Sequence, residues 1–235
     1  MMGGMKHDGE VRRLTGLLLS EWSRVYGPLT PLVARRALAA VRRDRERLGP
    51  VVEDPTRCRR CPRHRSGGRT PAGTGRRQAP PVMFIAGTPS RETEREGDLY
   101  TGPTGGLLAR MIERGMGLDR GEVYFTHLVK CWCPGGEDPA PEEVEACLPL
   151  LLHQIETIAP RVIVCLGRIT AGRLLETNKP VAFLRGQVHS FLGVPLVVTH
   201  HPAFLLRHPE RKREAWEDLK AAMGRAGIGG EARNE

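Results

Sequence analysis

The sequence contains no apolar run of the roughly 18 residues that a membrane-spanning helix needs. Its first ten residues are polar and mixed in charge, whereas a secretory signal has an apolar centre. The chain also shows no internal repeat. We therefore expect a cytoplasmic protein that does not associate with a membrane.

Acidic residues are the minority among the charged side chains. There are 27 Asp and Glu residues against 36 Lys and Arg, which gives a net charge of +9 and a pI near 9.7. Such a chain attracts polyanions, and nucleic acid is the commonest polyanion in a cell. The alternative is an arginine-biased composition without any such partner, and charge alone does not decide between the two.

Apolar periodicity indicates an α/β fold. The 235 residues are 40% hydrophobic, enough to bury one substantial core. Short apolar runs predict strands at 82–86, 123–129, 161–166 and 194–199. Helical patterns lie between and after them, at 107–115, 142–158, 168–175 and 210–223. This alternation predicts a three-layer α/β/α architecture around a central, mainly parallel four-stranded sheet, with ligands beyond the carboxyl ends of its strands.

We divide the chain into three parts. Residues 1–50 are expected to form an N-terminal helical extension, because apolar side chains recur there at intervals of three and four. Residues 51–225 form the α/β domain. Its first part, 50–81, is rich in Pro, Gly and Arg and needs something other than a hydrophobic core to hold it. Residues 226–235 are expected to be a flexible tail.

The six cysteines are poor candidates for disulfides, because the cytoplasm keeps thiols reduced. Cys58 and Cys61 form a C-x2-C pair, Cys131 follows the second predicted strand, and Cys147 lies within the next helix. Four such thiolates could hold a [4Fe–4S] cluster or a structural zinc ion, although a zinc ribbon normally has a second C-x2-C pair. Unlinked cysteines are the alternative. Cys165, inside an apolar strand, is most simply a core residue.

Several stretches resemble the family 4 uracil-DNA glycosylases. They are Lys130-Cys131, Pro139-x-Pro141-Glu142-Glu143, Cys147-Leu148-Pro149-x-Leu151, Pro160-x-Val162-Ile163, Leu184-Arg185-Gly186 and His201-Pro202-Ala203. The resemblance covers roughly residues 56–223 and keeps the cysteine interval of that family. It implies a [4Fe–4S] cluster with four ligands: Cys58, Cys61, Cys131 and Cys147. Cys133 stands where the family usually has proline and competes with Cys131 for this role.

The resemblance also implies the chemistry of base excision. The damaged base leaves the DNA stack, and as its N-glycosidic bond breaks, positive charge develops on the sugar and negative charge on the base. The site then needs a carboxylate or an oriented water near the sugar, a hydrogen-bond donor for the base oxygen, an aromatic platform, and a group that reads the base edge.

The first motif of the family aligns with residues 86–105 without a gap. It implies a set of base-pocket and DNA-binding residues: Gly87, Thr88, Pro89, Ser90, Tyr100 and Gly102. Tyr100 replaces the stacking phenylalanine of the family. Gly87 stands where the family has the acidic residue that orients water near the sugar. Glu94 is the candidate catalytic substitute, with Glu92 and Glu96 as alternatives.

The second and third motifs supply two histidines. His127 replaces an asparagine that reads uracil; it could read another base, act as an acid, attack covalently, or merely fill vacated space. His201 is the candidate catalytic donor to the departing base oxygen. Leu205 and Arg207 belong to the next segment, which is expected to enter the duplex and fill the gap left by the flipped base. The alternative is that Leu205 and Leu206 pack in the core.

Two functions remain open. The first is a DNA repair glycosylase with divergent motifs that removes uracil or another deaminated base. The second is a catalytically weak or inactive protein of the same fold that binds DNA lesions or single strands. We favour the enzyme, because a pure binder has less need for His201. An iron–sulfur electron carrier is a weaker third possibility, since it needs no base pocket. We expect the protein to bind damaged DNA, single- or double-stranded, and to be a monomer.

Overall fold

The computed structural model describes residues 58–65 and 71–228. The helical extension predicted for residues 1–50 lies outside the described residues. Within the described ranges, no helix has the length and apolar character needed to cross a membrane. The predicted tail begins at Ala226, which the structure places at the end of the last helix with 2% exposure.

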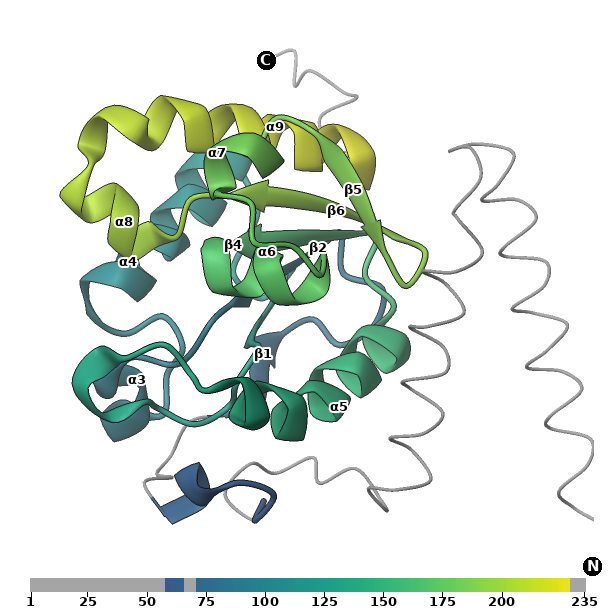
Figure 1. Cartoon of the computed structure of the whole chain (residues 1–235). Helices are drawn as coiled ribbons and strands as arrows, with labels where there is room; N and C mark the ends of the chain where they lie inside the picture. The colour runs from purple at the N-terminus through teal and green to yellow at the C-terminus, as the bar shows by residue number, and fades with distance from the viewer. Residues whose placement is uncertain (1–57, 66–70, 229–235) are drawn as a thin grey trace, which may run out of the picture.

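A six-stranded sheet forms the centre of the molecule (Figure 1). In chain order its strands are β1 (Gly73–Gly75), β2 (Val82–Ala86), β3 (Tyr124–His127), β4 (Val162–Leu166), β5 (Val188–Phe191) and β6 (Val194–Thr199). Their spatial order is β1-β3-β2-β4-β6-β5. The four inner strands are parallel, and the two edge strands pair antiparallel to their neighbours. The predicted α/β class and the mainly parallel sheet are therefore confirmed.

The predicted number of four strands is wrong, because the two edge strands were missed. β1 is only three residues long and reads Gly-Thr-Gly, so it has no apolar run. β5 carries His189 and Ser190, and none of its residues is fully buried. An edge strand has one free side and is less buried than an inner strand, so it lacks the hydrophobic pattern that identified the inner four.

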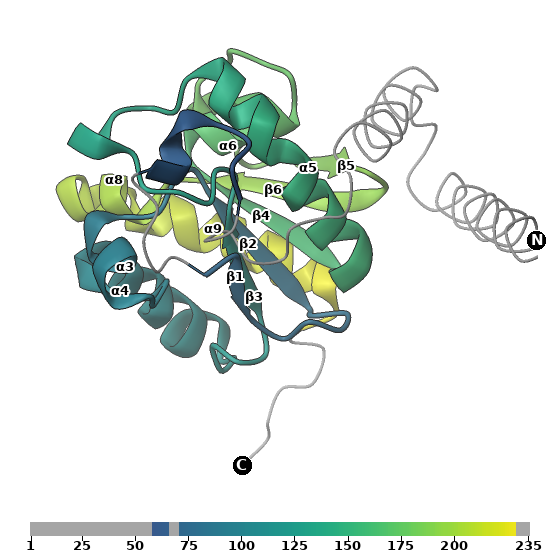
Figure 2. The same cartoon turned by 90° about the horizontal axis from the view of Figure 1, so that it is seen from below.

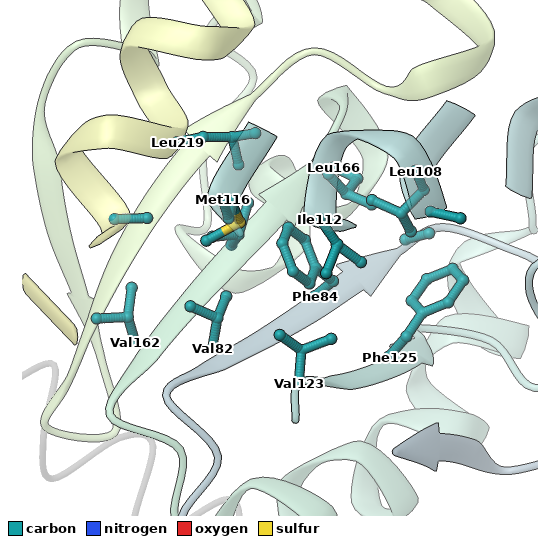
Figure 3. Close-up of a cluster of buried hydrophobic side chains, with 14 of the residues drawn as sticks. Val82, Phe84, Leu108, Ile112, Met116, Val123, Phe125, Val162, Leu166 and Leu219 are labelled. Atoms are coloured by element: carbon teal, nitrogen blue, oxygen red, sulfur yellow. The ribbon is translucent and has the colours of Figure 1, made fainter. Parts of the chain in front are cut away.

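Helices cover both faces of the sheet. On one face lie α4 (Gly102–Arg110), the π-helical turn Met111–Met116 and α9 (Lys212–Ala226), whose apolar side chains pack with Phe84 (Figure 3). On the other face lie α5 (Pro141–Ile158), α6 (Arg168–Leu174) and α7 (Val181–Leu184), packed on Met83 and Ile85. Successive side chains of a strand point to opposite faces, so β2 contributes to both cores. Figure 1 shows this predicted three-layer arrangement.

The predicted helix at 142–158 is confirmed as α5. Pro141 occupies its first turn, where a missing N–H costs nothing, and Glu142 and Glu143 lie at the positive end of its dipole. The predicted helix at 107–115 is longer in the structure, beginning at Gly102 and continuing through the π turn to Met116. Its glycine-rich first turn does not look helical in the sequence. Glycine is needed at position 105 of this turn because a Cβ there would lie 2.3 Å from the carbonyl carbon of Tyr100.

Two short helices follow strands that end at the candidate site. They are α3 (Arg91–Glu96), after β2, and α8 (Pro202–Arg207), after β6. Three 3-10 turns complete the described elements: Pro62–Arg65, Pro134–Gly136 and Pro209–Arg211.

Candidate active site and cysteine cluster

The loops after β2 and β3 leave the sheet side by side. Ala86 lies opposite His127 in the parallel register. The pairing continues past the strand ends, where the N–H of Leu128 donates to the Ala86 carbonyl at 2.8 Å and the N–H of Val129 donates to the Gly87 carbonyl at 3.0 Å. The first and second sequence motifs are therefore held together by backbone hydrogen bonds at the carboxyl edge of the sheet.

His127 is buried at the end of β3, with 5% of its surface exposed. Its ring lies 5.0 Å from that of Phe125, two residues earlier on the same face of the strand. Loss of solvation lowers the pKa of His127 well below its ordinary value, and the charges of Lys130 and His201 lower it further. The ring is therefore neutral at physiological pH, with one nitrogen as donor and the other as acceptor.

His201 is the N-cap residue of α8, directly beyond β6. Its Nδ1 accepts the N–H of Ala203 at 3.2 Å, so the proton of the neutral ring resides on Nε2. Burial lowers the pKa of His201 to about 4, and the charge of Arg207 contributes. Gly167, at the end of β4, lies against this histidine, since a Cβ there would be 3.0 Å from the His201 Cβ. His201 is thus held as a neutral donor, and it lies within electrostatic reach of His127.

Gly87 leaves room for a side chain beside this site. Its φ does not lie in the left-handed region. A Cβ added to Gly87 would contact only the Ile169 side chain, at 3.7 and 3.9 Å, which is ordinary van der Waals separation. The backbone therefore tolerates the larger residue that the family motif carries at this position, although the chain has glycine there.

The rest of the first motif shapes the loop after β2. Pro89 is buried, and Ser90 caps α3 by accepting the N–H of Thr93 at 3.1 Å. Thr88 hydrogen-bonds the thiol of Cys133. These contacts explain why the sequence turns sharply from β2 into α3. A direct contact of these residues with DNA stays a prediction.

Tyr100 is buried, with 8% exposure, in an aromatic row that leads to His127. Its ring lies 5.4 Å from Phe125, which in turn contacts His127. The guanidinium of Arg120 lies over the Tyr100 ring at 5.3 Å. Phe125, which the motif comparison did not single out, is thus the ring that contacts both predicted site residues. The role of Tyr100 as a stacking platform stays a prediction.

The predicted catalytic substitute Glu94 is placed on α3 with 9% exposure. Its charge raises the pKa of the Cys131 thiol, so it lies within electrostatic reach of the cysteines. Glu92, on the opposite side of the same short helix, is exposed and lies against Gly102, where a Cβ would be 3.3 Å from the Glu92 Cγ. A catalytic role of Glu94 stays a prediction.

The structure corrects the prediction that Leu205 faces DNA. Leu205 is 1% exposed and packs with Leu107 and Ala215, so its side chain belongs to the core. The neighbouring Leu206 is 38% exposed, and Arg207 is exposed at the end of α8. On a one-turn helix adjacent leucines point in different directions, and only the tertiary packing decides which of them is buried.

Four cysteines from three separate segments line one small cavity. They are Cys58, Cys61, Cys131 and Cys147. The pKa of the Cys131 thiol is raised to about 12, first by burial and then by the nearby thiols. Cys133 is buried and does not line this cavity. The geometry therefore favours Cys131 over Cys133 as the fourth member of the group.

An ion pair ties the C-x2-C segment to α5. The Arg63 Nε lies 2.6 Å from the Glu143 Oε2, and the same carboxylate accepts the N–H of Ala140 at the start of the helix. Cys147 follows Glu143 by one helical turn, so this contact places the segment 58–65 beside it (Figure 2).

The cysteine cavity matches a [4Fe–4S] cluster in the number and type of its ligands. Among residues 58–65 and 71–228, no three His, Cys, Asp or Glu side chains converge as they do around one ion. A [4Fe–4S] cluster is held by four cysteine thiolates. Cys58, Cys61, Cys131 and Cys147 line one cavity, and their binding of a cluster stays a prediction.

Lys130 lies between this cavity and the base site and is 2% exposed. Its Nζ donates to the Thr126 Oγ1 at 2.6 Å, to the Gln154 Oε1 at 2.7 Å and to the His127 carbonyl. Its backbone N–H donates to the Cys147 Sγ at 3.3 Å. The sequence showed this lysine only as part of a motif, without a role.

Glu214 is a site-supporting residue that the sequence did not reveal. It lies in the first turn of α9, and its Oε2 is 2.9 Å from the Nε2 of His200, the residue before His201. Phe204 stacks on the His200 ring at 4.9 Å. These contacts fix the connection from β6 to α8. An acidic residue at a helix start is ordinary in any sequence, so nothing marked Glu214 for this role.

Comparison with known proteins agrees with this architecture. The family model of the uracil DNA glycosylase superfamily matches residues 72–220. The chain is similar to a type-4 uracil-DNA glycosylase of Archaeoglobus fulgidus, with 33% identity over 74% of this chain and 91% of that protein. It is similar to a type-4 uracil-DNA glycosylase of Thermotoga maritima, with 34% identity over 76% and 94% of the two chains. A type-5 uracil-DNA glycosylase of Pyrobaculum aerophilum is 32% identical over 39% of this chain and 41% of its own length.

The chain therefore belongs to the uracil-DNA glycosylase superfamily, whose members are hydrolytic DNA N-glycosylases.

Proposed function

We propose that the protein removes a deaminated base from DNA by hydrolysing its N-glycosidic bond at the site between His127 and His201. The observation that carries this proposal is the state of His201, a neutral ring whose Nδ1 is occupied by the Ala203 N–H and whose Nε2 bears the proton.

A neutral imidazole suits the chemistry of the departing base. When the N-glycosidic bond breaks, negative charge develops on a base oxygen, and a fixed donor at that oxygen stabilises the transition state. Because the pKa of His201 is about 4, the ring is already neutral near pH 7. It can then donate a hydrogen bond from its Nε2–H to the base oxygen. The contacts with Gly167 and Ala203 hold the ring in place before the base arrives.

His127 is the group that would read the base edge. Its ring is buried and neutral, so it offers one donor and one acceptor. Deaminated bases carry carbonyl oxygens and ring N–H groups, which match that pair. Since His127 lacks the fixed amide of asparagine, we expect the site to accept deaminated bases other than uracil.

Water activation is the step for which this chain is least equipped. Gly87 has no proton-accepting group, although the family motif has an acidic residue at this position. Glu94 is the buried carboxylate nearest to Gly87 in the sequence. We expect hydrolysis of uracil to be slow for this reason.

Leu206 and Arg207 are the residues of α8 proposed to contact DNA. The exposed leucine is suited to fill the space of a flipped base, and the arginine to contact a phosphate. The net charge of +9 favours the same polyanion.

We propose that Cys58, Cys61, Cys131 and Cys147 hold a [4Fe–4S] cluster. When bound, the cluster would join the segment 58–65 to β3 and α5 and would act as a structural element. The Arg63–Glu143 ion pair also holds this segment to α5.

The test is an excision assay with the purified holoprotein. Labelled oligonucleotides carrying uracil, hypoxanthine or xanthine, single- and double-stranded, are incubated with protein and then cleaved with alkali at any abasic site. Wild-type protein is compared with Gly87→Glu and with the matched Gly87→Gln. We expect excision by the wild type, and a gain of about 10²-fold on uracil in Gly87→Glu alone, the low end of general base catalysis.

A second candidate function is lesion binding without cleavage, which the glycine at position 87 favours. Tight binding of a damaged strand with no abasic site for any base would establish it and reject the enzyme. Rapid uracil excision by the wild type would instead show that a substitute carboxylate is already in place.

A further inference from the structure

Lys130 is buried without a carboxylate partner in the part of the chain that the structure describes. The other described lysines, Lys179, Lys212 and Lys220, are all exposed. Removing an ammonium group from water is costly unless an opposite charge or strong hydrogen bonds replace its solvation. Among residues 58–65 and 71–228, no Asp or Glu forms an ion pair with Lys130.

The hydrogen bonds of Lys130 satisfy its donors but do not balance its charge. All three acceptors are neutral oxygens, on Thr126, Gln154 and the His127 backbone. Gln154 is itself fixed, because its Nε2 donates to the Ala72 carbonyl at 3.0 Å. The ammonium group is therefore held in one position inside the protein.

Lys130 adjoins the cysteine cavity, where negative charge would arise when a cluster binds. Cys147 is in direct contact with this residue, since its Sγ accepts the Lys130 backbone N–H at 3.3 Å. Lys130 also lines the cavity together with all four cysteines. A cysteine that binds iron does so as a thiolate, and four thiolates bring more negative charge than the iron–sulfide core of a [4Fe–4S] cluster neutralises.

We propose that Lys130 is the buried counter-charge of the iron–sulfur cluster and, through the His127 carbonyl, links the cluster to the strand end that reads the base. This inference rests on the proposed cofactor. It assigns Lys130 a positioning role, since the residue acts through the cluster and through β3.

The first test compares Lys130→Met with Gln154→Met in the holoprotein. Lys130→Met removes the charge and shortens the unbranched side chain by one atom, whereas Gln154→Met removes one hydrogen bond and leaves the charge. A nearby positive charge favours the reduced, more negative cluster. In a mediated titration, the midpoint potential should shift to a more negative value in Lys130→Met and stay at the wild-type value in Gln154→Met. The Fe–S(Cys) stretching bands of the unreduced cluster, read by resonance Raman, should shift in Lys130→Met alone.

An unchanged potential and unchanged stretching bands in Lys130→Met with a full complement of iron would overturn the proposal. Equal shifts in both variants would also overturn it, because they would assign the effect to the hydrogen-bond network.

A second measurement needs no variant and covers the case in which Lys130→Met does not fold. Wild-type holoprotein is labelled with acetic anhydride before and after chelation of iron, and each lysine is followed by mass spectrometry. Lys130 should be protected relative to the exposed Lys220 and should lose that protection with the cluster. Equal protection of Lys130 in both forms would contradict the proposal.

Iron and sulfide analysis distinguishes a failure of the proposed cofactor from a failure of the proposed role of Lys130. Wild-type protein purified without iron or sulfide, and unable to bind them on reconstitution, would reject the cofactor and with it the role of Lys130. A wild-type cluster that is indifferent to Lys130 rejects only the role of the lysine.

Discussion

The backbone N–H of Ala203 donates to the Nδ1 of His201 across 3.2 Å. This one hydrogen bond fixes the tautomer of the histidine and directs its proton-bearing nitrogen away from its own helix. Pro202 occupies the first helical position, where a missing N–H costs nothing, and Ala203 at the second position is the donor, as is usual for an N-cap. The sequence His-Pro-Ala thus sets the protonation pattern of the site as well as the start of α8.

Replacing His201 is expected to abolish most base excision. His201→Ala removes the donor to the departing base, and loss of one such donor typically costs about 10²–10³-fold in rate. The control is His208→Ala, an exposed histidine at the end of the same segment, which should keep wild-type activity. Single-turnover excision measures both variants, with DNA binding followed separately. A His201→Ala variant as fast as wild type would show that another group stabilises the leaving base.

The stability of the fold is expected to decrease in mild acid. The pKa values of His127 and His201 are both lowered in the folded protein, that of His201 to about 4. In the unfolded chain both return to about 6.5. Between these values the unfolded state binds more protons, so the stabilisation that is complete above about pH 6.5 is lost as the pH falls toward the folded pKa.

Urea unfolding at a series of pH values from about 7 to about 4 measures this loss. A His127→Asn variant should lose less free energy of unfolding over the same interval. Identical slopes in the variant and the wild type would mean that the pKa of His127 is the same in the folded and the unfolded protein.

Two neighbouring glycines of α4 should respond in opposite ways to alanine. In Gly105→Ala the new Cβ would lie 2.3 Å from the backbone of Tyr100, and relieving such overpacking costs about 1–3 kcal/mol or more. In Gly106→Ala the nearest atom is the Arg110 Nη1 at 3.6 Å, so the variant should gain roughly 0.5–1 kcal/mol from helix propensity. Denaturant unfolding compares the two, and equal stabilities would contradict the close approach of Tyr100.

Two neighbouring leucines of α8 should separate stability from DNA binding. Leu205→Ala empties a buried position and should lower the free energy of unfolding by about 2–5 kcal/mol. Leu206→Ala changes an exposed side chain, so its stability should stay within about 0.5 kcal/mol of wild type. Its affinity for damaged duplex should nevertheless fall. Undiminished affinity and excision in Leu206→Ala would remove this leucine from the proposed DNA contact.

Cysteine variants should identify the cluster ligands. Cys131→Ser is expected to lose iron, because this thiol lines the cavity with the other three cysteines. Cys133→Ser is the matched control two residues away and should retain iron, since its thiol bonds Thr88 instead. Iron and sulfide per protein, with the visible absorption of the cluster, give the result. Loss of iron in Cys133→Ser with retention in Cys131→Ser would reverse the assignment.

The sequence by itself determined the inner sheet and the places of the motifs. β2, β4 and β6 are apolar runs, and α5 has a proline and acidic residues at its start, so local patterns were enough to predict them. Because parallel strands end at one edge, the residues at and after these ends were expected to gather. His127 is the last residue of β3, and Gly87 and His201 follow the ends of β2 and β6.

Only the tertiary structure decided the features that depend on distant contacts. The edge strands exist through pairing with β3 and β6 rather than through their own weak patterns. The burial of Leu205 is set by α4 and α9, and the choice of Cys131 over Cys133 by where the C-x2-C segment packs. The position of Lys130 depends on oxygen atoms from two elements and a sulfur from α5. A local sequence pattern indicates which side chains of one segment are buried, whereas these properties depend on which segments pack against each other.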